Sequence, residues 1–144
     1  MQEALGLAAQ ALFLSNPNPR VGCVLVGRSG AVIGRGFTQQ AGGPHAEVMA
    51  LRDAAAQGHS TQGASAYVTL EPCAMCAMAL VHARVARVVY GASDPKTGAC
   101  GSVFDLIADP RHNHRVEVVG GVLGDEAGRR LTNYFRAKRG RPLV

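Results

Sequence analysis

The chain has 144 residues, of which 47% are apolar and 17% are charged, and its formal net charge is +5. This composition excludes a disordered chain and is typical of one compact domain, which we expect to span residues 1–144. No apolar run approaches the roughly 18–20 residues that span a bilayer, and the start lacks the basic region of a signal peptide. We therefore expect a cytoplasmic protein that has no membrane partner.

Taken in chain order, the first half of the sequence predicts a helix, a hairpin and a second helix. Residues 3–14 have apolar side chains at helical spacing, and the two prolines within 15–19 end that helix. Short apolar runs over 21–26 and 31–36, joined by a turn that contains glycine, predict a β-hairpin. A glycine-rich loop then leads into a helix over 45–57.

The second half alternates strands with helices. It predicts strands over 66–70, 85–90 and 116–119 and helices over 73–83 and 125–139. Glu71 and Pro72 turn the chain from the first of these strands into a helix. The order α, β, β, α, β, α, β, β, α predicts an α/β fold, a three-layer α/β/α sandwich around a mixed five-stranded sheet.

The positive charge is concentrated at the end of the sequence. Residues 129–144 contain six basic residues and no acidic residue, whereas the rest of the chain has nine basic and ten acidic residues. This distribution is typical of a protein that binds a polyanion, although a solvated helix with cations at its carboxyl end also fits. Tyr134 and Phe135 lie inside the basic segment and favour RNA, because bases stack on aromatic rings.

A metal-binding pattern stands in the middle of the chain. His45-Ala46-Glu47 is followed, 28 residues after the histidine, by Pro72-Cys73-Ala74-Met75-Cys76. His45, Cys73 and Cys76 supply three zinc ligands and leave a fourth position for water, as catalytic zinc sites do. The two cysteines lie one turn apart at a helix start, where free N–H groups stabilise thiolates.

The carboxylate of Glu47 completes the pattern of a hydrolytic deaminase. Zinc lowers the pKa of a bound water towards about 7, and Glu47 is placed to carry protons to the ring nitrogen and the departing amine. A lone C-x-x-C would also fit a redox pair or half of a structural zinc site. The two motifs in this order, however, are the signature of zinc-dependent nucleobase deaminases. We predict Zn²⁺ as the cofactor and Glu47 as the catalytic residue.

The remaining cysteines and two of the histidines carry weaker signals. Cys23 and Cys100 lie in apolar or glycine-rich stretches and are expected to be buried core residues. His112 and His114 flank Asn113 in a polar cluster, which fits either a contact with phosphate or a simple polar turn.

Residues 66–139 resemble the family of bacterial tRNA-specific adenosine deaminases. The matching stretches are YVTLEPCAMC, HARVARVVYGASDPKTGACGS and NHRVEVVGGVLGDEAGRRLTNYFRAKR. The resemblance implies a cytidine-deaminase-like fold, a homodimer, and conversion of the wobble adenosine of a tRNA to inosine. The tRNA anticodon stem-loop is then the expected partner, and Asp94 and Phe135 are expected to line the path of the nucleotides beside the target.

The first third of the chain resembles instead the deaminase domain of riboflavin biosynthesis. NPNPRVGCVLV and GRGFTQQAGGPHAEVMALRDA carry this resemblance, which implies a small diaminopyrimidine nucleotide as substrate. The longer insert that riboflavin-type deaminases have between the two cysteines is replaced here by C-x-x-C. In tRNA deaminases the aromatic residue of a G-x-G-aromatic turn is followed by an asparagine that holds the base and ribose. Here the turn is Gly34-Arg35-Gly36-Phe37 and the next residue is Thr38. Asn18 is a possible substitute for that asparagine.

The two resemblances lead to different substrates. In the leading hypothesis the enzyme is a tRNA adenosine deaminase in which Asn18, Thr38 and the backbone of Ala46 and Leu70 contact the flipped base. The alternative is a small-molecule deaminase that acts on a free base, a nucleoside or a diaminopyrimidine nucleotide, of riboflavin, cytosine or guanine type. A third hypothesis, a non-catalytic zinc scaffold or partner subunit, is disfavoured because such subunits tend to lose the carboxylate that Glu47 supplies.

Overall fold

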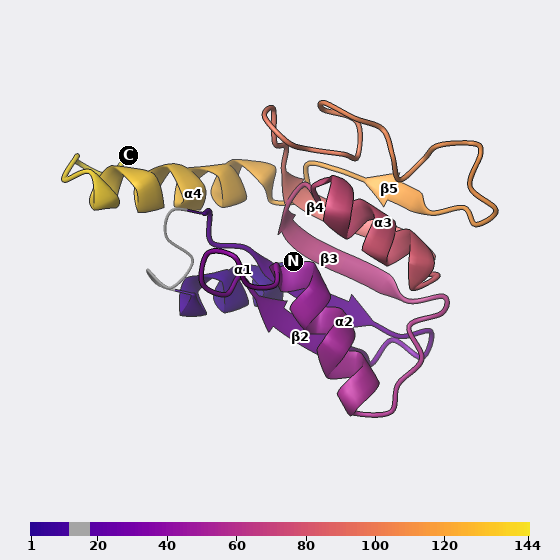
Figure 1. Ribbon diagram of the computed structural model, residues 1–144. Coiled ribbons are helices and arrows are strands. Elements are labelled where there is room, and N and C mark those ends of the chain that lie inside the picture. Colours follow the sequence, from indigo (N-terminus) through magenta and orange to yellow (C-terminus); the bar gives the residue numbers. More distant parts are fainter. Residues whose placement is uncertain (12–17) are drawn as a thin grey trace.

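The computed structural model describes residues 1–11 and 18–144, and within them the elements follow the expected order (Figure 1). These are α1 (Gln2–Gln10), β1 (Gly22–Val26), β2 (Val32–Phe37), α2 (Ala46–Ala56), β3 (Ser65–Leu70), α3 (Ala74–His82), β4 (Arg87–Ala92), β5 (Glu117–Val119) and α4 (Gly124–Lys138). From β1 onward each boundary lies within two residues of the predicted one. The predicted end of the first helix and most of its proline stop lie outside the described residues. No helix in the described ranges is long and apolar enough to cross a membrane.

The strands form one mixed sheet in the order β2-β1-β3-β4-β5. β1 runs antiparallel to both of its neighbours, whereas β3, β4 and β5 run parallel to one another. Parallel neighbours need a crossover connection, which α3 supplies between β3 and β4 and a long loop over 93–116 supplies between β4 and β5. The predicted mixed five-stranded sheet is therefore confirmed.

Helices cover both faces of this sheet, with α1 and α4 on one face and α2 and α3 on the other. Strand glycines let two of the helices lie directly on the strand backbone. A Cβ atom at Gly22 would come within 2.7 Å of the amide nitrogen of Ala8 in α1. A Cβ atom at Gly36 would come within 2.5 Å of the amide nitrogen of Ala50 in α2. The three-layer sandwich predicted from the order of elements is confirmed.

The main core lies between the sheet and the layer formed by α2 and α3. Leu25, Val68, Leu80 and Val88 are fully buried there, and burial of each such side chain contributes about 1.5–3 kcal/mol. Cys23 and Cys100 are both buried, as predicted, and burial raises the pKa of the Cys100 thiol to about 12. This packing holds α2 and α3 side by side, so that their amino ends lie close together.

Candidate metal centre and substrate cavity

The metal-binding pattern is built from the starts of two helices. His45 is the N-cap of α2 and Cys73 is the N-cap of α3, and both have extended backbone with ψ of 166° and 175°. A residue in this conformation stands just outside its helix, and Cys76 lies one turn inside α3. Because α2 and α3 pack on the same face of the sheet, the histidine and both cysteines meet.

The spacing of the three ligand atoms fits a tetrahedral zinc site. The Nδ1 atom of His45 lies 3.7 Å from the Sγ atom of Cys73 and 3.5 Å from the Sγ atom of Cys76. All three atoms lie within 4.8 Å of one another. Zinc bonds of about 2.3 Å to sulfur and about 2.0–2.1 Å to nitrogen, at a tetrahedral angle, require N···S distances of about 3.6 Å. Both the donor set and its dimensions suit Zn²⁺.

Hydrogen bonding within the cluster prepares one thiolate. The hydrogen bond from Cys76 and the contact with His45 lower the pKa of Cys73 to about 4, against the opposing effect of burial. The hydrogen bond to Cys73 in turn raises the pKa of His45. The positive end of α3 acts in the same direction, because Cys73 stands at its first turn. A negative charge is thus in place to receive a cation.

Glu47 lies beside the cluster in the first turn of α2 and is only 4% exposed. Burial raises its pKa to about 7, and its neighbours Cys73, His45 and Cys76 adjust that value. A carboxyl group with this pKa both accepts and releases a proton near neutral pH, as a proton shuttle must. The geometry therefore brings the predicted catalytic residue next to the predicted ligands.

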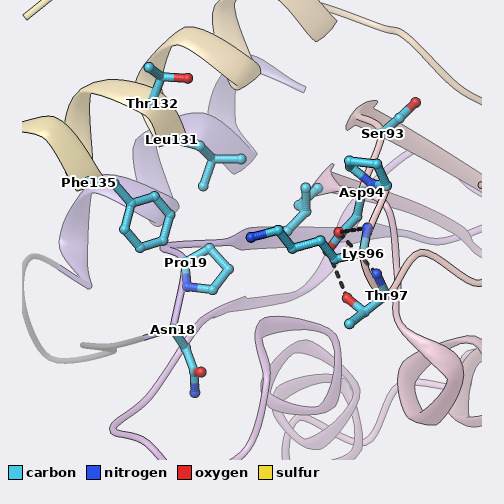
Figure 2. Close-up of a pocket in the computed structure, with 11 residues that line it drawn as sticks. Asn18, Pro19, Ser93, Asp94, Lys96, Thr97, Leu131, Thr132 and Phe135 are labelled. Carbon is cyan, nitrogen blue, oxygen red and sulfur yellow. Dashed lines mark hydrogen bonds between the residues drawn. The ribbon is translucent and has the colours of Figure 1, made fainter.

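A cavity of about 600 Å³ lies between α4 and the loop that follows β4 (Figure 2). It brings together four of the six residues that the sequence proposes as substrate contacts: Asn18, Leu70, Asp94 and Phe135. The metal ligands are not among its lining residues, and Leu70, three residues before Cys73, connects the two places. The metal centre and the cavity are therefore adjacent but separate sites.

Thr38 and Ala46, the other two proposed contacts, do not line this cavity. The Oγ1 atom of Thr38 accepts a hydrogen bond from the amide of Val21 at 3.0 Å, and Thr38 is 4% exposed. Ala46 is fully buried at the start of α2, between His45 and Glu47. The roles proposed for these two residues stay predictions.

The loop that follows β4 forms a polar wall of the cavity. On the polar side, Asp94 Oδ1 accepts hydrogen bonds from the amides of Lys96 at 3.0 Å and Thr97 at 3.2 Å, and Oδ2 accepts one from Thr97 Oγ1 at 2.8 Å. Figure 2 shows the Lys96 side chain extending from this loop towards Leu131 and the opposite wall. The carboxylate of Asp94 thus shapes the loop that presents Lys96.

Two residues that line the cavity, Leu131 and Thr132, are not among the substrate contacts proposed from the sequence. Leu131 and Thr132 lie four and three residues before Phe135 on one flank of α4, and this helical spacing was a signal available in the sequence.

Glu71, expected only in a turn, is 2% exposed. Burial opposes its ionisation, but hydrogen bonds from Ser102, Asp94 and Cys100 prevail and lower the pKa of Glu71.

The polar cluster before β5 forms a structural turn. The Nε2 atom of His114 lies 2.7 Å from the carbonyl oxygen of Val85, and the Nε2 atom of His112 contacts the carbonyl oxygen of Leu106. Arg84 donates a hydrogen bond to the side chain of Asn113 at 3.1 Å. These contacts favour the polar turn over a phosphate contact for both histidines.

The terminal helix α4 combines a buried stripe with a basic surface. Ala127 and Tyr134 are nearly fully buried on this helix. The guanidinium of Arg20 lies 4.6 Å from the centre of the Tyr134 ring, and that of Arg139 lies 6.0 Å from the centre of the Phe135 ring. One cation, Arg139, therefore borders Phe135, the aromatic residue that lines the cavity.

Comparison with protein families gives one family match. Residues 1–92 match the family described as the cytidine and deoxycytidylate deaminase zinc-binding region. The tRNA-specific adenosine deaminase of Haemophilus influenzae is 43% identical over 145 residues, which cover 96% of this chain and 83% of that enzyme. The match therefore extends beyond the metal pattern to the cavity and α4.

Two solved structures of different enzymes share the fold. A diaminohydroxyphosphoribosylaminopyrimidine deaminase/5-amino-6-(5-phosphoribosylamino)uracil reductase from Thermotoga maritima superposes with a TM-score of 0.81 at 35% identity. That match covers 99% of this chain but only 41% of the larger enzyme. A structure from work on A-to-I editing by tRNA:A34 deaminases at the wobble position superposes with a TM-score of 0.74 at 37% identity, covering 89% of this chain and 95% of the other.

Proposed function

The chain belongs to the cytidine and deoxycytidylate deaminase family, and we propose that it deaminates adenosine to inosine at the wobble position of a tRNA anticodon loop. In this proposal residues 1–144 act as one deaminase domain. The observation that carries the choice of substrate is the position of Phe135, which lines the cavity on one side and borders a basic surface on the other. The extended similarity to a tRNA-specific adenosine deaminase supports the same choice.

The chemistry follows from the buried carboxyl group beside the ligand cluster. His45, Cys73 and Cys76 would hold zinc, which when bound supplies the Lewis acidity that activates water. Glu47 then takes a proton from the attacking water and delivers it to N1 of adenine. The same carboxylate then takes the proton of the new C6 hydroxyl and gives it to the amine, which departs from C6, so that water and adenosine become inosine and ammonia. Its pKa of about 7 suits both transfers.

The base must leave its stack to reach this centre. We propose that the Asn18 amide, which offers a separate donor and acceptor, contacts the base together with Thr38 and the backbone of Ala46 and Leu70. Phe135 would stack against a neighbouring base and Asp94 would hold the loop that borders it. Base stacking on an aromatic ring tolerates any sequence, so this contact gives affinity more than selectivity.

The basic surface of α4 would contact the phosphates around the anticodon loop. Arg129, Lys138 and Arg139 are exposed on this helix. Each phosphate contact that is lost should flatten the dependence of binding on salt, by about 0.7 in slope for a single strand. A chain truncated after Gly128 that keeps the full salt dependence of tRNA binding would exclude this role.

A tRNA substrate also implies a cytoplasmic location.

Deamination of a small diaminopyrimidine nucleotide is the second candidate. The specific observation in its favour is the structural similarity to the Thermotoga maritima deaminase/reductase, which covers nearly all of this chain. The volume of the cavity, about 600 Å³, is also within the range of small-ligand sites. This candidate predicts turnover that is indifferent to the charges of α4.

One experiment separates the two candidates. Zinc-loaded protein is incubated with an anticodon stem-loop that carries a wobble adenosine and, in parallel, with the free diaminopyrimidine nucleotide, cytosine and guanine. Mass spectrometry detects the replacement of an amine by oxygen as a gain of about 1 Da. Inosine in the stem-loop that disappears with Glu47→Ala supports the tRNA proposal. Turnover of a small substrate with unchanged RNA rejects it.

We also propose that the active form is a homodimer. Met75, Val103 and Phe104 are apolar side chains that are 58%, 44% and 52% exposed. They come from adjoining segments, because the carbonyl oxygen of Gly98 accepts hydrogen bonds from both Val103 and Phe104 while Gly98 pairs with Cys73. A Phe104→Asp variant should sediment as a monomer if a second copy covers this patch. A wild-type protein that sediments as a monomer contradicts the proposal.

A further inference from the structure

A buried carboxylate joins the metal-binding turn to the wall of the cavity. Glu71 follows β3 directly and precedes Pro72 and Cys73. Its Oε1 atom accepts hydrogen bonds from the amide of Asp94 at 3.1 Å and from the hydroxyl of Ser102. Its Oε2 atom accepts bonds from the amides of Cys100 at 3.0 Å and Ser102 at 3.1 Å. One side chain therefore holds both ends of the loop over 94–102.

Backbone contacts lock the same loop to the ligand turn. The amide of Ala99 donates to the carbonyl oxygen of Pro72 at 2.9 Å, and Gly98 forms an isolated bridge with Cys73. A Cβ atom at Gly98 would overlap the carboxylate of Glu71. The loop is thus pressed against the segment that carries the first cysteine ligand.

The charge of Glu71 is balanced by dipoles. None of the ion pairs among the described residues includes it. Its partners are the backbone N–H groups and the hydroxyl of one loop, and each of these donors would lose its acceptor if the loop moved. Because the Cys100 amide is buried and an unsatisfied buried donor is costly, the carboxylate favours one position of the loop.

That position sets the polar wall of the cavity. Ser93, Asp94 and Thr97 all line the cavity, and Asp94 passes the constraint on through its bonds to Lys96 and Thr97. The chain of contacts therefore runs from Cys73 through Glu71 to the residues that face the cavity. A shift of about 1 Å in such a wall is enough to cost about 100-fold in kcat/KM.

We propose that Glu71 is a positioning residue that fixes the substrate-facing loop relative to the metal ligands. It acts through Asp94 and Lys96 and touches neither the reacting atoms nor the metal. The inference rests on the proposed function for the choice of substrate, but the contacts that carry it do not depend on that choice.

The test is Glu71→Gln, which keeps the shape of the side chain but directs an amide at N–H donors. Glu117→Gln is the matched control, because Glu117 is an exposed carboxylate on β5 that pairs with Arg87 at 3.2 Å. Ser102→Ala removes one donor and leaves the carboxylate in place. Each protein is loaded with zinc, and kcat and KM are measured for whichever of the substrates above the wild type turns over.

For Glu71→Gln we expect a KM about 30–100-fold higher, a kcat within about threefold of wild type, and an unchanged zinc content. Ser102→Ala should raise KM by less, about fivefold, and Glu117→Gln should change neither constant. A fall in kcat with loss of zinc would show that Glu71 only supports the ligand turn, and would overturn the proposal. So would kinetic constants equal to those of wild type.

Hydrogen exchange supplies a readout that needs no substrate. In Glu71→Gln the amides of Asp94, Cys100 and Ser102 should exchange at least about tenfold faster, while those of β3 and β4 keep their rates. Unchanged exchange at the three loop amides would reject the positioning role. A wild-type protein that leaves the stem-loop unmodified would instead reject the proposed substrate, and the two failures are distinguishable.

Discussion

The metal centre and the substrate cavity are built in opposite ways. Two short motifs, each at the start of a helix, supply the whole metal cluster, and its atoms lie within 4.8 Å of one another. The cavity draws its walls from segments around residues 18, 70, 93–97 and 131–135 and is about 600 Å³ in volume. The proposed chemistry thus depends on local sequence, whereas the cavity proposed for the substrate depends on the way distant segments pack.

This difference explains why one family contains enzymes with unlike substrates. The positions of the ligand atoms and Glu47 depend on the packing of α2 and α3 against the sheet. The cavity walls depend in part on loops, which tolerate change more easily than the elements that they connect. Perturbing the two regions separately should therefore give different kinetic signatures.

Removal of the metal should have the largest effect. Treatment with a chelator is expected to lower deamination by about 10³-fold or more, and addition of Zn²⁺ should restore it, because the three ligands have the geometry of a zinc site. Rates and zinc content are measured on the same samples. Activity that persists in protein without bound zinc would contradict the assignment of the metal centre.

Replacement of Glu47 by glutamine should come next. Glutamine has nearly the same volume but neither accepts nor releases a proton near neutral pH, so kcat should fall by about 10²–10⁴-fold. Zinc content and the Kd for the stem-loop should stay near wild-type values, since the side chain is buried beside the ligands and does not line the cavity. A variant whose binding falls as much as its rate would remove the proposed separation of the two regions.

Phe135→Ala should affect the cavity alone. Loss of one stacking contact costs about 1–3 kcal/mol, so the Kd for the stem-loop should rise by about 5–150-fold while kcat changes little. Val119→Ala is the control, because Val119 is an exposed apolar side chain on β5 that lies outside both the cavity and the proposed dimer patch. Equal binding by wild type and Phe135→Ala would exclude stacking at this position.

The smallest expected effect concerns the metal-free protein. The pKa of Cys73, about 4, is far below that of an ordinary thiol, about 8.5, so Cys73 stays ionised as the pH falls from 8 to 5.5. Its alkylation by iodoacetamide should change by less than about twofold over that range, and Cys23, which is fully buried, should not react. Peptide mass spectrometry measures both rates. A tenfold fall in the Cys73 rate per pH unit would show that the thiol is protonated.

Most of the fold was accessible from sequence because its signals are local. Alternating apolar runs and proline or glycine stops place every strand within two residues of its observed position. The metal centre was equally accessible, since His45, Glu47, Cys73 and Cys76 belong to two contiguous motifs. In both cases the information lies within a few neighbouring residues.

The cavity was accessible only in part. Resemblance supplied Asp94 and Phe135, and helical spacing relates Leu131 to Phe135, but no single segment encodes that α4 packs beside the loop after β4. Glu71 shows the same limit. Its burial depends on donors near residues 94 and 102, more than twenty positions away. Contacts between residues so far apart in the sequence can be predicted only when the topology of the sheet is known.

Gly36 is a position in β2 at which the fold should not tolerate a larger side chain. The glycine lies under the first turns of α2, where an added methyl group would come within 2.5 Å of the amide nitrogen of Ala50 and 2.7 Å of the Cβ atom of Met49. Lifting α2 would carry His45 and Glu47 away from the two cysteines together. In a saturation mutagenesis screen for activity, this strand glycine should therefore be as intolerant as the catalytic carboxylate, although it takes no part in the chemistry.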